Sequence, residues 1–419
     1  MRLRINSILS GRYLFILLLV MGLIYRIIFA SLSDSGLFWD MERYHGFAVD
    51  ILSGRWAADC CNKNVGYGAF LAGIYAVFGL NNLTAVRLIQ VAADLAVSVF
   101  VYLTAGRLFG RREAMIAFII YLTNPVTSSY TGLRLPESLS LLVLSLLGYI
   151  FTLPGFKTKP GLWISTGLLL GVFLFIRQSF YLFVLAFMAL GAFLFFRRLK
   201  RIAFLAAALG GFFAVSWYTL AANYAVFNKI SLVAPYHASY SNMYYQFYQP
   251  GRWPELTRFM PQVDPRLTAI VLEYYATPDT QKDGYERKYK RLFLERLKTD
   301  WPLYLRIWAR NAYLLWDKEY LFTYTDRFYP ADRWPVRIYN TAFLALFFGG
   351  LVKYALHNRK RVMNDPLLVF VLMLMGYITF TFSLVSNESR HTVVCYAYAA
   401  IWAGYTLAKL IPEKAQIQT

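Results

Sequence analysis

The sequence predicts an all-α protein that crosses a membrane many times. Only 16% of its 419 residues are charged, whereas 58% are hydrophobic and 18% are aromatic. Soluble domains average about 25% charged and 45–50% apolar residues, so the chain has too few charges for a water-exposed globule. Long apolar runs recur along it, and Lys and Arg gather in short stretches between them. The net charge of +20 therefore does not indicate a nucleic-acid partner, and three cysteines are too few for a disulfide scaffold.

The apolar runs predict a bundle of about ten membrane-spanning helices, within a range of about 10–12, because each span needs about 20 mostly apolar residues. The first run is long enough to cross the bilayer, so no cleavable signal peptide is evident. Only Arg177 separates the fifth run from the sixth, which form either a tight hairpin or one broken segment. The ten runs lie at roughly 13–32, 83–106, 112–130, 135–153, 161–176, 178–196, 201–224, 335–356, 365–385 and 391–411.

A shorter run at 65–80 decides the predicted topology. If it does not cross the membrane, the predicted cytoplasmic loops and termini hold 18 basic residues against three acidic ones. If it crosses, the same basic loops fall outside, which contradicts the positive-inside rule. We therefore expect 65–80 to be a juxtamembrane helix on the outer face. The basic connections are 107–112, 157–159, 197–201 and 353–361.

This topology divides the chain into three parts. Residues 1–224 form an N-terminal transmembrane module whose first outer loop is 33–82, residues 225–334 form an extracytoplasmic segment, and residues 335–419 supply the last three helices. The extracytoplasmic segment has 16 basic and 12 acidic residues and a Tyr-rich stretch at 236–248. Those tyrosines either stack on sugar rings or lie at the membrane interface, and the interface is slightly favoured.

The first outer loop holds the most informative residues. Apolar residues at helical spacing predict an amphipathic juxtamembrane helix at about 40–53. Asp40 falls one turn before Tyr44, and taken alone it is best interpreted as a helix N-cap. Lys63 precedes the 65–80 helix, where it suits a lipid phosphate, although an ordinary snorkelling lysine is the better interpretation in isolation.

Together these motifs resemble the GT-C glycosyltransferases, in particular the branch with protein O-mannosyltransferases and the lipid A aminoarabinose transferase. The resemblance covers about residues 1–200 well and the last 35 loosely. Asn64 and Val65 replace two prolines of the family pattern, and Asn62 stands where the aminoarabinose branch has Glu. The matching elements are Asp40, Tyr44 and Gly54; Lys63, Gly66, Tyr67, Phe78 and Gly79; Ala85–Leu88; Val101–Leu103 and Arg107–Gly110; Pro136–Glu137; Gly167–Gly171 with Arg177; and Arg390–His391.

The resemblance implies an inverting transferase that takes a sugar from a polyprenyl phosphate and passes it to an acceptor hydroxyl. Phosphate is a good leaving group, so one carboxylate suffices as general base, and Asp40 fits that role. The departing phosphate needs cations. The expected phosphate-binding residues are Lys63 and Arg390, followed by Arg87 and Arg177.

Further side chains are expected to contact the substrates. Glu137 is costly at the membrane edge, so it is a functional candidate, or else it forms a structural salt bridge with Arg134 or Arg87. Asp94 is expected to be structural and paired within the bundle. The other substrate-binding candidates are Arg43, Tyr44, Tyr67, Glu388 and His391. The four His are too scattered for a metal cluster, so no cofactor is assigned and a divalent metal lacks support.

Two alternatives stay open: a flippase or transporter of a lipid-linked saccharide, and a non-catalytic subunit of an envelope glycan assembly complex. No phosphate-binding loop supports nucleotide use. The sequence names neither the sugar nor the acceptor, which is a glycan, a lipid or a protein. The expected location is the bilayer of a bacterial plasma membrane with the active site on the extracytoplasmic face, and an endoplasmic-reticulum protein would have the same orientation of that face.

Overall fold

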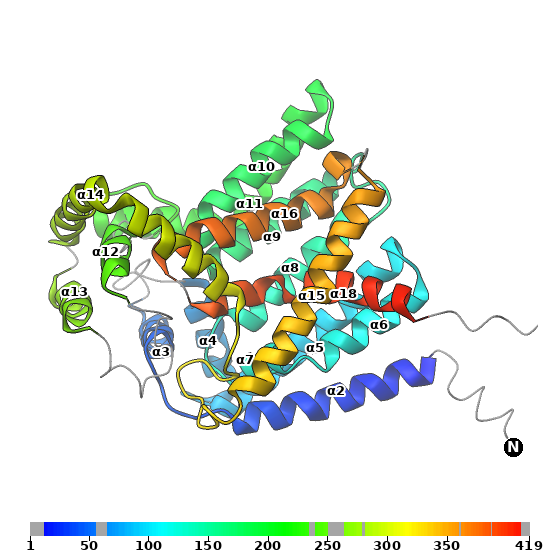
Figure 1. The fold of residues 1–419 in the computed structure, drawn as a ribbon. Helices are drawn as coiled ribbons and strands as arrows, with labels where there is room; N and C mark the ends of the chain where they lie inside the picture. Colours follow the sequence, from blue (N-terminus) through cyan, green and yellow to red (C-terminus); the bar gives the residue numbers. More distant parts are fainter. Residues whose placement is uncertain are drawn as a thin grey trace, which may run out of the picture.

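The computed structural model describes residues 12–55, 65–233, 239–249, 264–278, 281–359, 362–386 and 388–411, and within these the chain folds into helices without a β-sheet (Figure 1). The prediction of an all-α, multi-pass membrane protein is confirmed. Within the described ranges seven helical segments are long and apolar enough to cross a membrane. They are Tyr13–Leu32, Leu83–Leu108, Gln178–Phe195, Leu199–Ala225, Arg333–His357, Pro366–Val385 and Ser389–Leu410.

The predicted count of ten spans is not confirmed, because three of the predicted stretches hold shorter helices. The 112–130 stretch is broken into α6 (Arg111–Leu122) and α7 (Pro125–Tyr130). Asn124 causes this break, since its side chain accepts hydrogen bonds from the N–H groups of Val126 and Thr127 and Pro125 cannot continue α6. The other two are α8 (Glu137–Phe151) and α9 (Pro160–Ile176).

The bundle is built around α18 (Tyr396–Leu410). This helix makes up most of Ser389–Leu410, the most enclosed of the seven membrane-length segments in the described ranges. Helices α5 (Leu83–Leu108), α6 and α15 (Arg333–His357) pack against it. Small residues permit this close packing. A Cβ at Gly404 would lie 2.6 Å from the backbone N of Ala117 on α6.

A second tightly packed pair is α9 and α11 (Arg198–Phe227). A Cβ on Gly167 of α9 would collide with the carbonyl oxygen of Ala208, and one on Gly211 of α11 would collide with that of Ile164. Arg177, with non-helical φ −137° and ψ 80°, ends α9. It is followed by η1 (Gln178–Phe180) and α10 (Tyr181–Phe195).

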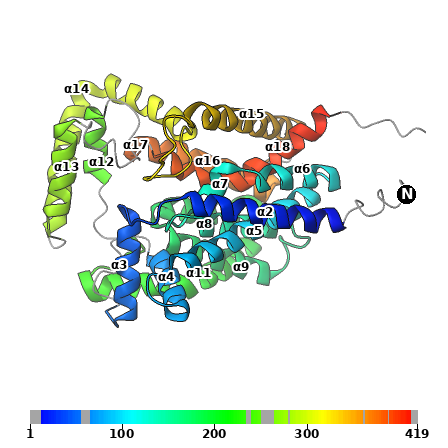
Figure 2. The same cartoon turned by 90° about the horizontal axis from the view of Figure 1, so that it is seen from below.

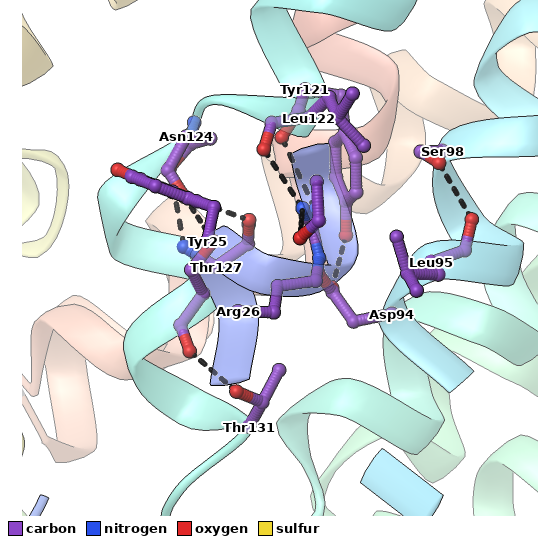
Figure 3. A network of polar contacts seen from close by, with 12 residues as sticks. Tyr25, Arg26, Asp94, Leu95, Ser98, Tyr121, Leu122, Asn124, Thr127 and Thr131 are labelled. Atoms are coloured by element: carbon purple, nitrogen blue, oxygen red, sulfur yellow. Dashed lines mark hydrogen bonds and ion pairs between the residues drawn. The ribbon is translucent and has the colours of Figure 1, made fainter. Parts of the chain in front are cut away.

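A buried ion pair ties the first helix, α2 (Arg12–Leu32), to its neighbours (Figure 3). Arg26 Nε lies 2.5 Å from Asp94 Oδ2, and Arg26 Nη1 donates to the carbonyl oxygen of Leu122 at 2.8 Å. Tyr121 donates its hydroxyl to Asp94 Oδ1 at 2.5 Å. The prediction that Asp94 is paired within the bundle is confirmed.

The segment between α11 and α15 contains α12 (Ser239–Tyr245), η2 (Gln246–Tyr248), α13 (Pro265–Ala276) and the kinked α14 (Lys282–Trp316). It has a small hydrophobic core of its own, to which the Tyr-rich stretch contributes. Half-buried tyrosines pack around that core. The core residues are Tyr245, Leu267, Ile270, Tyr285 and Tyr289.

Figures 1 and 2 show α12 and α13 at the same end of the bundle as α3 (Asp40–Leu52). The helix α4 (Val65–Phe78) follows α3 in the sequence and packs against it. The first loop and the later helical segment thus share one end of the molecule. The remaining helical elements are α16 (Pro366–Tyr377), η5 (Val362–Asn364), η6 (Ile378–Phe382), α17 (Ser383–Val385) and η7 (Ser389–Cys395).

Candidate active site

The centre of the candidate site is an ion pair between Asp40, the first residue of α3, and Arg390 on η7. Asp40 Oδ2 lies 2.7 Å from Arg390 Nη2, and Glu388 Oε2 lies 2.5 Å from Arg390 Nε. The Asp40 and Arg390 side chains are only 13% and 9% exposed. The structure therefore brings together three predicted site residues from opposite ends of the chain.

A second ion pair lies deeper. Arg177 Nη1 is 3.0 Å from Glu137 Oε1, and Arg177 Nη2 is 3.4 Å from His391 Nδ1. The His391 ring stacks on Phe382, with the ring centroids 3.9 Å apart. Glu137 is fully buried, and its Oε2 has no hydrogen-bond partner among the described residues. Its ion-pair partner is thus Arg177, not Arg134 or Arg87, the two partners considered from the sequence.

The aromatic rings of Tyr44 and Tyr67 pack against each other next to Asp40. Their rings meet edge to face with centroids 5.1 Å apart, and Tyr67 donates its hydroxyl to Gln90 Oε1 at 2.8 Å. Burial, and after it the neighbouring Asp40 carboxylate, raises the pKa of Tyr44 above its ordinary value. Tyr44 therefore stays neutral and keeps its hydroxyl proton. Arg43, which directly precedes Tyr44 on α3, is half-buried.

Arg87, in contrast, lies apart from this cluster. Its guanidinium donates to the carbonyl oxygens of Ser33, Asp34 and Gly132 at 2.9–3.1 Å, and also to the Ser33 hydroxyl. It therefore holds the start of the first loop against the turn between α7 and α8. Lys63, another of the four predicted phosphate-binding residues, is outside the described residues.

Tyr324 is a site residue that the sequence analysis missed. It lies in the connection between α14 and α15, with a φ of 72° that is unusual for a residue other than Gly. The Arg390 Cζ atom lies 5.4 Å from the centroid of its ring. Asp326 fixes the connection by accepting hydrogen bonds from four backbone N–H groups. A lone Tyr in an irregular loop has no periodicity or motif that would have revealed it.

The site combines a carboxylate at the end of a surface helix with a buried cationic and acidic network. A carboxylate in this setting can accept a proton, and an arginine beside it can stabilise a developing negative charge. Within the described ranges no group of three His, Cys, Asp or Glu side chains is arranged to hold a metal ion.

The chain is similar to known proteins in part of its sequence and in its fold. Residues 63–219 match the family model described as dolichyl-phosphate-mannose-protein mannosyltransferase. No curated protein sequence matches the chain.

Two solved structures of an Archaeoglobus fulgidus oligosaccharyltransferase have a similar fold. The apo form is 11% identical with a TM-score of 0.52, over 96% of this chain and 51% of that chain. The form in complex with an inhibitory peptide and a dolichol-phosphate is 14% identical with a TM-score of 0.50, over 95% and 50%. The present chain thus spans about half the length of those proteins. The family match to part of the chain and the shared fold both agree with the resemblance drawn from the sequence.

Proposed function

We propose that this protein is an inverting glycosyltransferase that moves a sugar from a polyprenyl phosphate to an acceptor hydroxyl. The observation that carries the proposal is the Asp40–Arg390 ion pair, which sets a general base beside a cation at the end of a helix bundle of the GT-C type. The match of residues 63–219 to a family named for a lipid-phosphate sugar donor supports the donor class.

In the proposed reaction the acceptor hydroxyl attacks C1 of the sugar and its proton passes to Asp40. The C1–O bond to the acceptor forms as the C1–O bond to the phosphate breaks, and the electron pair leaves with the phosphate. Arg390 stabilises the charge that develops on the leaving group. Lys63 and Arg177 are proposed to help to hold this phosphate, and Arg87, which lies apart from the Asp40–Arg390 pair, is proposed to bind a lipid phosphate at its own position.

The remaining predicted residues are proposed to contact the sugar or the acceptor. Glu137 is the strongest of these, because its buried Oε2 lacks a hydrogen-bond partner within the described ranges and can accept one from a sugar hydroxyl. The others are Arg43, Tyr44, Tyr67, Glu388 and His391.

The acceptor is proposed to meet the site beside α12–α14, the segment that shares its end of the bundle with α3 (Figure 2). A peptide or protein acceptor is favoured over a glycan or a lipid. This preference rests on the family named for protein mannosylation and on the oligosaccharyltransferase solved with an inhibitory peptide. The distribution of basic loops supports an extracytoplasmic active face, with a bacterial plasma membrane as the proposed location.

The proposal is tested with the full chain reconstituted into vesicles that contain a labelled polyprenyl-phosphate sugar and candidate acceptors. We expect labelled acceptor, detected by mass spectrometry, together with free polyprenyl phosphate. Movement of the labelled lipid across the bilayer without any transferred sugar would overturn the proposal and favour the transporter. The Asp40→Asn variant should lose this activity. Its matched control is Asp50→Asn, which lies on the same helix but is paired with the exposed Arg55 at 2.8 Å.

A further inference from the structure

Arg134, in the turn between α7 and α8, is a buried cation that forms no ion pair with any acidic residue that the structure describes. Arg134 as a whole is only 3% exposed. Arg134 Nη2 donates to Asn81 Oδ1 at 2.7 Å, whereas its Nε has no hydrogen-bond partner among the residues that the structure describes. In this respect it differs from Arg26, Arg177 and Arg390, each of which contacts a carboxylate within 3.0 Å.

Arg87 places a second positive charge in the same corner. It is anchored on the carbonyl oxygen of Gly132, two residues before Arg134, and its other hydrogen-bond acceptors are also uncharged groups. Asp34 is the nearby acid, but its exposed carboxylate accepts a hydrogen bond from the Gly36 N–H and forms no ion pair with either arginine in the described ranges. Two guanidinium groups therefore gather with no ion-paired carboxylate to balance them.

Among the described residues, the histidine nearest to Arg134 does not alter this balance of charge. His45 of α3 lies beside this corner, with its Nδ1 3.1 Å from the Tyr75 hydroxyl on α4. Burial, and after it the Arg134 charge, lowers the pKa of His45, so the imidazole is neutral at pH 7. A buried charge without a partner costs several kcal/mol, which makes an external anion the natural counter-charge.

We propose that Arg134 and Arg87 form a binding site for a lipid phosphate ester, separate from the Asp40–Arg390 pair. Guanidinium groups suit this ligand because their N–H groups match phosphate oxygens in bidentate pairs. The site lies beside α3 and α4, since Arg134 contacts Asn81 after α4 and its charge acts on His45 of α3. These two helices are expected at headgroup depth, where lipid phosphates are found. The ligand is the phosphate of a bilayer phospholipid or that of the polyprenyl carrier. The inference does not require that the protein transfers sugar.

The test measures the thermal unfolding midpoint of the full chain in micelles of a phosphate-free detergent. Phosphatidylglycerol, polyprenyl phosphate or inorganic phosphate is added in separate arms. We expect one or both lipids to raise the wild-type midpoint by a few degrees and Arg134→Gln to abolish that rise. Arg134→Lys, which keeps the charge, should retain part of it. A rise with phosphatidylglycerol assigns the site to bilayer lipid, and a rise with polyprenyl phosphate alone assigns it to the carrier.

The lipid-free midpoint separates this role from a merely structural one. Without added anion, Arg134→Gln should unfold at or above the wild-type temperature, because the variant removes an uncompensated buried charge. The matched control Arg55→Gln, at an exposed arginine paired with Asp50, should respond to lipid like wild type. A variant that unfolds earlier yet keeps the full lipid response would overturn the inference, as would a wild type that responds to no lipid. Since no turnover is measured, a failed transfer assay leaves this result intact.

Discussion

Asp40 and Arg390 are 350 residues apart in the sequence, yet their side chains are joined by a 2.7 Å hydrogen-bonded ion pair. Asp40 begins the surface helix α3, whereas Arg390 lies in η7, the first turn of the last membrane-length segment. The site therefore forms only when the first loop packs against the beginning of the last membrane-length segment. This long-range contact explains how a base on a surface helix can be held in place by a cation anchored in the bundle.

Loss of the Arg390 charge should disable the site. For Arg390→Gln we expect transfer to slow by about 100-fold, in line with removal of a single oxyanion-stabilising donor. Initial rates of transfer, with Arg55→Gln as control, check the prediction. A properly folded Arg390→Gln protein that transfers sugar at the wild-type rate would contradict a role for this cation in the site.

The Arg26–Asp94 pair should contribute to stability and not to chemistry. Asp94→Leu leaves Arg26 buried without its carboxylate, so we expect a loss of about 3–5 kcal/mol in unfolding free energy. The double variant Arg26→Met, Asp94→Leu should recover much of that loss, because neither charge remains buried alone. Unfolding in detergent measures both. A double variant that is less stable than Asp94→Leu alone would contradict this account.

Asp332 predicts a pH dependence of stability. Burial and the neighbouring Asp326 carboxylate raise the pKa of Asp332 to about 7, from an ordinary value of 3.8. The folded state therefore holds this proton more tightly than the unfolded state, so stability should fall as the pH rises from about 4 to 7 and then level off. Asp332→Asn should match wild type near pH 4 and be more stable at pH 8. Equal unfolding midpoints at pH 8 would argue against the raised pKa.

Much of this structure follows from sequence patterns that depend on local physics. Apolar runs and basic loops predict an all-α membrane bundle, and the pairing of Asp94 follows from the cost of a buried charge. The count of ten spans is not confirmed, in part because a local signal, the Asn124–Pro125 break, divides one run into two short helices.

Side-chain partners were harder to predict, because they depend on which helix ends meet. The sequence proposed Arg134 or Arg87 for Glu137, yet Arg177 occupies that position, because the end of α9 packs beside the start of α8. Arg87 lies apart from the Asp40–Arg390 pair, because backbone carbonyl groups hold its guanidinium there. Tyr324 depends on a loop conformation for which no sequence pattern exists.

The central claim is that Asp40 is the general base, and the Asp40→Asn variant tests it most directly. The measurement is the single-turnover rate of sugar transfer at saturating polyprenyl-phosphate sugar, with donor binding measured in the same preparation. The proposed mechanism predicts a rate about 100- to 10,000-fold lower, with the donor still bound and with Asp50→Asn unaffected. A properly folded Asp40→Asn protein that transfers sugar at the wild-type rate would contradict it.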